Sequence, residues 1–151
     1  MGAETPGRVM LQELADTARA TFGARAVSIL VADAGAGELV FAAVSGEGAD
    51  TLSGRRISAA RGIAGWVLET GQPLVVEDVT QDPRFAAGFA RSTGYVPKGI
   101  MAAPIPGDEH PLGVMNVLDR ARRPTRNLIE VDLLERFCRL VALALEAAGD
   151  A

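Results

Sequence analysis

Two pairs of β-rich runs, each joined by a short turn, constrain the fold of this 151-residue chain more than any other feature. The four runs are residues 26–32, 39–44, 100–105 and 112–118. Residues 34–37 supply a glycine-containing turn for the first pair, and residues 106–111 supply a polar turn for the second. Such pairs favour antiparallel hairpins. Because short strands are also expected at residues 56–58 and 74–76, the sequence predicts one antiparallel sheet of five to six strands.

Helices are predicted on both sides of the strand-forming part of the sequence. Residues 8–22 and about 127–148 carry apolar side chains at spacings of three and four, which places those side chains on one helix face. A shorter helix is expected near residues 63–70. Residues 140–145 are apolar on every side, and such a helix must be covered on more than one side. We expect its own sheet on one side, and the first helix, a second subunit or both on the other.

Composition narrows the class of protein. Hydrophobic residues make up 48% of the chain and charged residues 23%, proportions typical of a globular protein, so we expect a single domain over residues 1–151 with its core at about 9–148. The net charge of −4, with scattered basic residues, argues against a nucleic-acid partner. One cysteine and one histidine exclude an internal disulfide framework and disfavour a zinc site.

The sequence also bears on location and source. No apolar run approaches the roughly 20 residues of a membrane span, and residues 1–7 lack the basic and then apolar order of a signal peptide. We therefore expect a cytoplasmic protein with no membrane partner. Fourteen of the fifteen basic residues are arginine and only Lys98 is lysine. In a chain rich in alanine and glycine, this excess favours a GC-rich genome, and we expect a bacterial source.

The segment of residues 78–98 breaks the regular pattern and holds the aromatic residues Phe85, Phe89 and Tyr95. A long irregular stretch inside a compact domain is typically either a functional loop or a packed loop with short helices. Two interpretations therefore stay open: these rings line a ligand pocket, or they fill the open face of the sheet as a small separate core. Asp78 likewise accepts hydrogen bonds either from a ligand or from its own loop.

Several motifs occur in a fixed order along the chain. They are Gly62-Ile63-Ala64-Gly65-Trp66-Val67, Thr70-Gly71-Gln72-Pro73-Leu74, Glu77-Asp78-Val79, Asp82-Pro83-Arg84-Phe85, the run 100–105 and Leu112-Gly113-Val114. With the flanking helices they resemble the GAF domain family, which is related to PAS domains and profilin, over roughly residues 9–148. The resemblance implies an α+β fold with the N- and C-terminal helices on one face of the sheet. Short helices and a lid loop, residues 78–98, would cover a small-molecule pocket on the other face.

The resemblance also implies a role. GAF domains sense cyclic nucleotides, haem, bilins, small acids or amino acids, and they usually signal through dimer-forming terminal helices. We therefore expect a sensory domain that binds a small molecule and forms a homodimer through the helices at residues 8–22 and 127–148. Because the sequence shows no output domain, we also expect a signalling partner in trans. The residues expected at the ligand site are Ser28, Trp66, Asp78, Phe85, Phe89, Tyr95 and Met101.

Some ligands of the family are disfavoured here. Its cyclic-nucleotide members carry Asn-Lys and later Phe-x-x-x-Asp-Glu, and of that pattern only Asp132 is present. A covalently bound bilin needs a cysteine near the lid, and haem needs an axial ligand that His110 is poorly placed to supply. An apolar or mixed-polarity metabolite remains. The arginines at positions 120, 122, 123 and 126 either bind an anionic group or form a solvated loop.

Two other functions stay open. One is a dimerisation module that binds no ligand. The other is an enzyme, because one branch of the family consists of free methionine-R-sulfoxide reductases. That chemistry needs one thiolate to attack the sulfoxide and another to resolve the intermediate. Cys138 is the only cysteine of this chain, so we expect no enzymatic activity and no catalytic residue.

Overall fold

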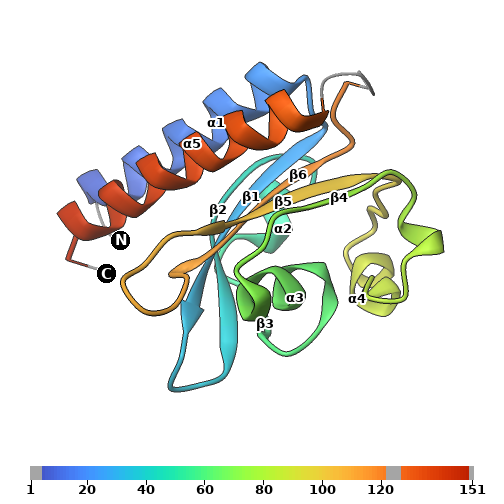
Figure 1. Ribbon diagram of the computed structural model, residues 1–151, viewed down its shortest axis with the longest axis horizontal. Helices are drawn as coiled ribbons and strands as arrows, with labels where there is room; N and C mark the ends of the chain where they lie inside the picture. The colour runs from blue at the N-terminus through green and yellow to red at the C-terminus, as the bar shows by residue number, and fades with distance from the viewer. Residues whose placement is uncertain (1–4, 122–126, 150–151) are drawn as a thin grey trace.

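The computed structural model describes residues 5–121 and 127–149 of the chain. Within these residues a six-stranded sheet has the strand order β3-β2-β1-β6-β5-β4, and every neighbouring pair is antiparallel (Figure 1). The strands are β1 (Ala26–Asp33), β2 (Glu38–Gly46), β3 (Arg56–Ser58), β4 (Leu74–Val76), β5 (Ile100–Ile105) and β6 (Gly113–Leu118). The predicted α+β fold with one antiparallel sheet is confirmed.

The helices lie on both faces of the sheet. They are α1 (Pro6–Phe22), α2 (Ala49–Leu52), α3 (Gly62–Thr70), the 3-10 helix η1 (Val79–Gln81), α4 (Ala87–Ser92) and α5 (Asn127–Ala147). Helices α1 and α5 run antiparallel, side by side, over one face, and α2, α3 and α4 lie beyond the other (Figure 1). Among the described residues, no helix has both the length and the apolar character that crossing a membrane requires.

Alternation along the strands divides the core into two clusters, because successive side chains of a strand point to opposite faces. On β1, Val27 and Ile29 are buried in the cluster beneath α1 and α5. Leu30 is buried in the other cluster, which includes Ile63 and Val67 of α3. The sheet therefore separates the face covered by α1 and α5 from the face that carries the candidate site.

The terminal helices begin and end with well-defined caps and pack closely. The hydroxyl of Thr5 accepts a hydrogen bond from the amide of Arg8 at 3.3 Å, and Gly23 ends α1 in the left-handed conformation with φ 58°. A Cβ on Gly7 would lie 2.6 Å from the Cβ of Ala148, so glycine permits the close approach of the first turn of α1 to the end of α5. Both predicted terminal helices are confirmed.

Arg120 joins the end of β6 to the start of α5. Its side chain is 5% exposed, its Nε donates to Glu130 at 3.0 Å, and its Nη2 donates to Asn127 at 2.5 Å. The Nη1 of Arg120 also lies 3.9 Å from the Oε1 of Glu77. Arg120 is thus a structural junction, whereas the arginines at positions 122, 123 and 126 lie outside the described residues.

The helix α2 lies where the sequence predicts a loop. The polar stretch of residues 46–54, which has the composition of a loop, contains the single-turn helix α2, and Leu52 of α2 is buried in the cluster that includes α3. A helix of four residues is too short to show the apolar periodicity from which helices are predicted.

Candidate functional site

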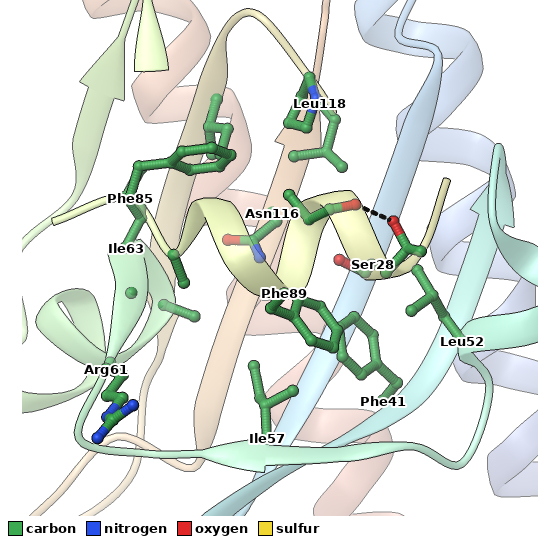
Figure 2. Close-up of a pocket in the computed structure, with 18 of the residues that line it drawn as sticks. Ser28, Phe41, Leu52, Ile57, Arg61, Ile63, Phe85, Phe89, Asn116 and Leu118 are labelled. Carbon is green, nitrogen blue, oxygen red and sulfur yellow. Dashed lines mark hydrogen bonds between the residues drawn. The ribbon is translucent and has the colours of Figure 1, made fainter. Parts of the chain in front are cut away.

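A cavity of about 840 Å³ lies between the sheet and the segments that cover its second face. Strands β1, β2 and β6 form one side (Figure 2). The other side is formed by α3 and by residues 83–97 of the lid segment 78–98, which contains α4. Small-molecule sites commonly have volumes of roughly 300–1,000 Å³. The irregular segment therefore covers a hollow of ligand size.

Aromatic rings form one wall of the cavity. Phe41 of β2 and Phe89 of α4 stack with their centroids 6.1 Å apart, and the guanidinium of Arg55 lies 5.0 Å from the centroid of Phe89. Phe89 is thus held between a strand residue and a cation. Phe85 also lines the cavity, and among the described residues it stacks on no other ring.

Trp66 ties α3 to the start of the lid. The guanidinium of Arg84 lies 4.7 Å from the centroid of the Trp66 ring, and the Nε of Arg84 donates to Asp82 at 2.8 Å. The hydrogen bond from Arg84 holds the pKa of the Asp82 carboxyl below its usual value. Trp66 lines the cavity, with one ring face beneath a cation.

The floor of the cavity carries two polar side chains on central strands. Ser28 of β1 and Asn116 of β6 are cross-strand partners, and both line the cavity. Ser28 is 4% exposed, and the Oδ1 of Asn116 is buried with no hydrogen-bond partner among the described residues. Proteins satisfy most buried polar atoms, so this oxygen is an acceptor that the described residues leave unused.

Sequence analysis found Ser28 but missed Asn116. The signal was present, because Asn116 is the only hydrogen-bonding side chain in the run Gly113–Leu118. It shares its strand face with Val114 and Leu118, which pack into the cluster on the cavity side. A polar side chain on an otherwise apolar face of a central strand is typical of a binding residue or of a buried hydrogen bond.

Tyr95 lines the cavity and fastens the end of the lid. Its hydroxyl donates a hydrogen bond to the carboxylate of Asp119, which directly follows β6. Burial, together with this bond to Asp119, raises the pKa of the Tyr95 hydroxyl well above its usual range. The guanidinium of Arg25 lies 5.0 Å from the Tyr95 centroid. The Tyr95 hydroxyl therefore stays protonated and hydrogen-bonded to Asp119 at neutral pH.

Two of the expected site residues lie away from the cavity. Asp78 accepts hydrogen bonds from the hydroxyl and the amide of Thr80 at 2.7 and 3.0 Å, and these bonds hold its pKa below its usual value. It orders its own loop. The prediction for Met101 is wrong, because Met101 is buried beneath α1 and α5, whereas Ile100 and Ala102 belong to the cavity side. An error of one residue in a strand reverses the face.

The start of α3 also borders the cavity. Gly62 has φ 74°, in the left-handed region that favours glycine, and it lines the cavity. A Cβ on Gly65 would lie 2.8 Å from the carbonyl oxygen of Ala59, so this glycine is required by close packing. The side chain of Arg61, which directly precedes α3, makes no capping hydrogen bond to that helix.

The single histidine and the single cysteine of the chain lie away from the cavity. His110 is exposed in the turn between β5 and β6. Cys138 of α5 is buried on the opposite face of the sheet, with its Sγ 3.7 Å from the carbonyl oxygen of Ala103. Burial raises the pKa of the Cys138 thiol to about 12. Neither side chain reaches the lining of the cavity.

Paired terminal helices lie on one face of an antiparallel sheet, and a lidded cavity of ligand size lies on the other, in an α+β domain. The comparison with known families agrees, since the GAF domain profile matches residues 7–145. The chain belongs to the GAF domain family, a family of regulatory and sensory domains.

Individual relatives show where such domains occur. The mouse (Mus musculus) cone cGMP-specific 3',5'-cyclic phosphodiesterase subunit alpha' is 29% identical over 84 residues, which cover 56% of this chain and 10% of that protein. The chain thus spans about a tenth of the length of this curated relative.

Solved structures share the fold. The GAF domain from a Coxiella burnetii phosphoenolpyruvate-protein phosphotransferase superposes with a TM-score of 0.82 and 18% identity, over 99% of this chain and 89% of that chain. The free methionine-R-sulfoxide reductase from Neisseria meningitidis, in complex with its substrate, has a TM-score of 0.74 and 23% identity. That match covers 96% of this chain and 83% of the reductase chain. At this level of identity the likeness concerns the fold alone.

Proposed function

We propose that this GAF domain is a sensor that binds a small molecule between the sheet and the lid segment 78–98. The observation that carries the proposal is the cavity of about 840 Å³, which has aromatic walls and a polar floor. A residue pattern of this kind, mostly apolar with a few convergent polar groups, is typical of small-molecule sites. Ser28, Trp66, Phe85, Phe89 and Tyr95 line this cavity.

The sheet offers a physical route from the cavity to the terminal helices. Asn116 lies on the cavity face of β6, and its chain neighbours Met115 and Val117 are buried beneath α1 and α5. A ligand that shifts Asn116 therefore displaces groups that pack against both helices. Interiors are densely packed, so a small displacement of a strand is transmitted to the elements packed on it.

The terminal helices offer a surface through which the signal would leave the domain. Leu140 and Leu143 of α5 are 50% and 60% exposed, and Val9 and Met10 of α1 are 43% and 41% exposed. Apolar side chains on paired helices favour association. We propose that these helices pack against a second copy of the chain in a homodimer, or against a signalling protein in trans.

The placement of Cys138 favours a regulatory role over the reductase activity of the Neisseria meningitidis protein. An attacking thiol must be accessible and partly ionised. Cys138 is buried between α5 and β5, across the sheet from the cavity, and burial raises the pKa of its thiol to about 12. Its thiol would meet neither a bound ligand nor solvent.

Native mass spectrometry combined with thermal shift against a metabolite library tests the proposal. We expect a dimeric mass and a saturable rise of the melting temperature with at least one metabolite, because a ligand that binds only the folded state stabilises it. The variant Ser28→Phe, which places a ring in the cavity, should abolish the shift and keep the far-ultraviolet circular dichroism spectrum. A monomer that responds to no compound, or a shift that survives Ser28→Phe, would contradict the proposal.

A further inference from the structure

Asn116 lies on the strand side of the cavity. It projects from the central strand β6 into the space between Phe85 and Phe89 (Figure 2). Its cross-strand neighbours are Ser28 on one side and Ala102 on the other. Both of these cross-strand neighbours have small side chains. Within the described part of the chain its Oδ1 is buried and unpaired.

The chemistry of this group determines what it can select. A carboxamide presents an acceptor oxygen and a donor nitrogen side by side in one plane. Its complement is a ligand edge with an N–H donor next to an acceptor, as in the pairing of asparagine with the edge of adenine. A ligand that brings only acceptors leaves the Oδ1 of Asn116 unsatisfied, which costs binding free energy.

The surroundings of Asn116 add shape and charge. Phe85 lines the same space and stacks on no other ring among the described residues, so one more flat ring can pack against it. Four arginines line the cavity. Arg56 and Arg84 are held in ion pairs with acidic residues, Arg55 lies 5.0 Å from the centroid of Phe89, and Arg61 directly precedes α3. No charged side chain is a cross-strand neighbour of Asn116. This part of the cavity therefore suits a neutral group.

We propose that Asn116 is the specificity-determining residue of the cavity and that its ligand is a small planar ring with a neutral amide-type edge. In such an edge an N–H donor, which meets the Oδ1 of Asn116, lies next to a carbonyl or ring-nitrogen acceptor, which meets the Nδ2. The inference rests on the proposed function, since it assumes that the cavity binds a ligand.

Protein stability supplies a readout that does not depend on any ligand. Asn116→Leu removes a buried, unpaired acceptor and keeps a similar volume, so we expect the melting temperature of the free protein to rise. The other asparagine of the chain, Asn127, is a matched control: it accepts a hydrogen bond from Arg120 and donates one to Glu77. Asn127→Leu should lower the melting temperature.

Binding is tested with two probes that differ by one methyl group. Quinolin-2(1H)-one is a flat lactam whose N–H lies next to its carbonyl, and 1-methylquinolin-2-one lacks that donor. We expect the full-length protein to bind the lactam about tenfold more tightly than the methylated ring, because only the lactam satisfies Oδ1. NMR titration at millimolar probe concentration gives both affinities. The preference should vanish in Asn116→Leu and persist in Asn127→Leu.

Any result other than these contradicts the inference about Asn116, and the pattern of binding shows whether the proposed function fails with it. Equal affinity for the two probes, or a preference that persists in Asn116→Leu, would retain a ligand cavity and remove Asn116 as its selector. The same conclusion follows if neither probe binds while a compound from the metabolite library does. A fall in the melting temperature of Asn116→Leu would assign the residue a structural role. If neither the probes nor the library bind, both proposals fail.

Discussion

One carboxylate oxygen of Asp119 accepts a hydrogen bond from Tyr95, and the other accepts hydrogen bonds from backbone amides shortly after Tyr95. The hydroxyl of Tyr95 donates to Oδ2, and the amides of Lys98 and Gly99 donate to Oδ1 at 2.8 and 2.9 Å. Asp119 has φ 52°, a left-handed conformation that aspartate tolerates better than most residues. This residue thus fastens the end of the lid to the end of β6.

Loss of the Tyr95 hydroxyl should loosen the lid. We expect Tyr95→Phe to lower the free energy of unfolding by about 1–2 kcal/mol, because a partly buried hydrogen bond to a charged group is lost and the ring remains. Urea denaturation measures this change. Hydrogen exchange should accelerate in residues 93–99 and not in α5. Unchanged stability and unchanged exchange would show that the bond to Asp119 does not hold the lid.

The ion pair between Arg120 and Glu130 should be worth far more than an exposed pair on the same helix. The two side chains are 5% and 11% exposed, so Glu130→Ala leaves a buried guanidinium without its main partner. We expect a loss of about 3 kcal/mol in unfolding free energy, measured by urea denaturation.

A matched control lies at Asp132, whose pair with Arg136 has side chains that are 63% and 65% exposed. Asp132→Ala should change stability by less than about 0.5 kcal/mol. Similar losses for the two variants would contradict the structural role assigned to Arg120.

Two glycines should respond in opposite ways to alanine. A Cβ on Gly65 would lie 2.8 Å from the backbone oxygen of Ala59, so Gly65→Ala should destabilise the protein by about 1–3 kcal/mol despite the helix preference of alanine. A Cβ on Gly88 of α4 would meet nothing within 4 Å, so Gly88→Ala should stabilise by about 0.5–1 kcal/mol. Thermal denaturation compares the two. A shift of the same sign for both variants would refute the packing argument.

The terminal helices and the strands were predictable because their sequence patterns are local. The strands at 56–58 and 74–76 have the expected bounds, and the helix expected at 8–22 begins two residues earlier, at Pro6. Apolar spacing, turn residues and caps carry this information in a short window of sequence. The recognition of the GAF domain followed from motifs in a fixed order.

The face of β5 and the cavity were not predictable in the same way. The run 100–105 is almost wholly apolar, because both of its faces are covered, so no alternation shows that Met101 points to the helices. Phe89 can either pack into the open face of the sheet or cover a cavity above it. Which of the two occurs depends on its contact with Phe41, which lies far away in the sequence. The unpaired oxygen of Asn116 likewise depends on which groups surround it in three dimensions.

Alkaline pH should destabilise the protein through Cys138. Burial raises the pKa of its thiol from 9.0 to about 12, so the folded state keeps a proton that the unfolded state loses. The stabilising contribution is complete below pH 9 and is lost as the pH rises from 9 towards 12. The expected slope is about 1.4 kcal/mol per pH unit in that window. Urea denaturation at several pH values should show a shallower slope for Cys138→Ala, and an identical slope would disprove the assignment.

The exposed leucines of α5 should govern self-association. Leu140 and Leu143 are 50% and 60% exposed, so in a homodimer through the terminal helices they would be buried against the partner. We expect the double variant Leu140→Glu/Leu143→Glu to be monomeric by light scattering, because it places carboxylates in an apolar interface. Val96→Glu, at a residue of the lid that is 48% exposed, is the matched control and should leave the mass unchanged. A double variant with the mass of the wild type would exclude this surface as the dimer interface.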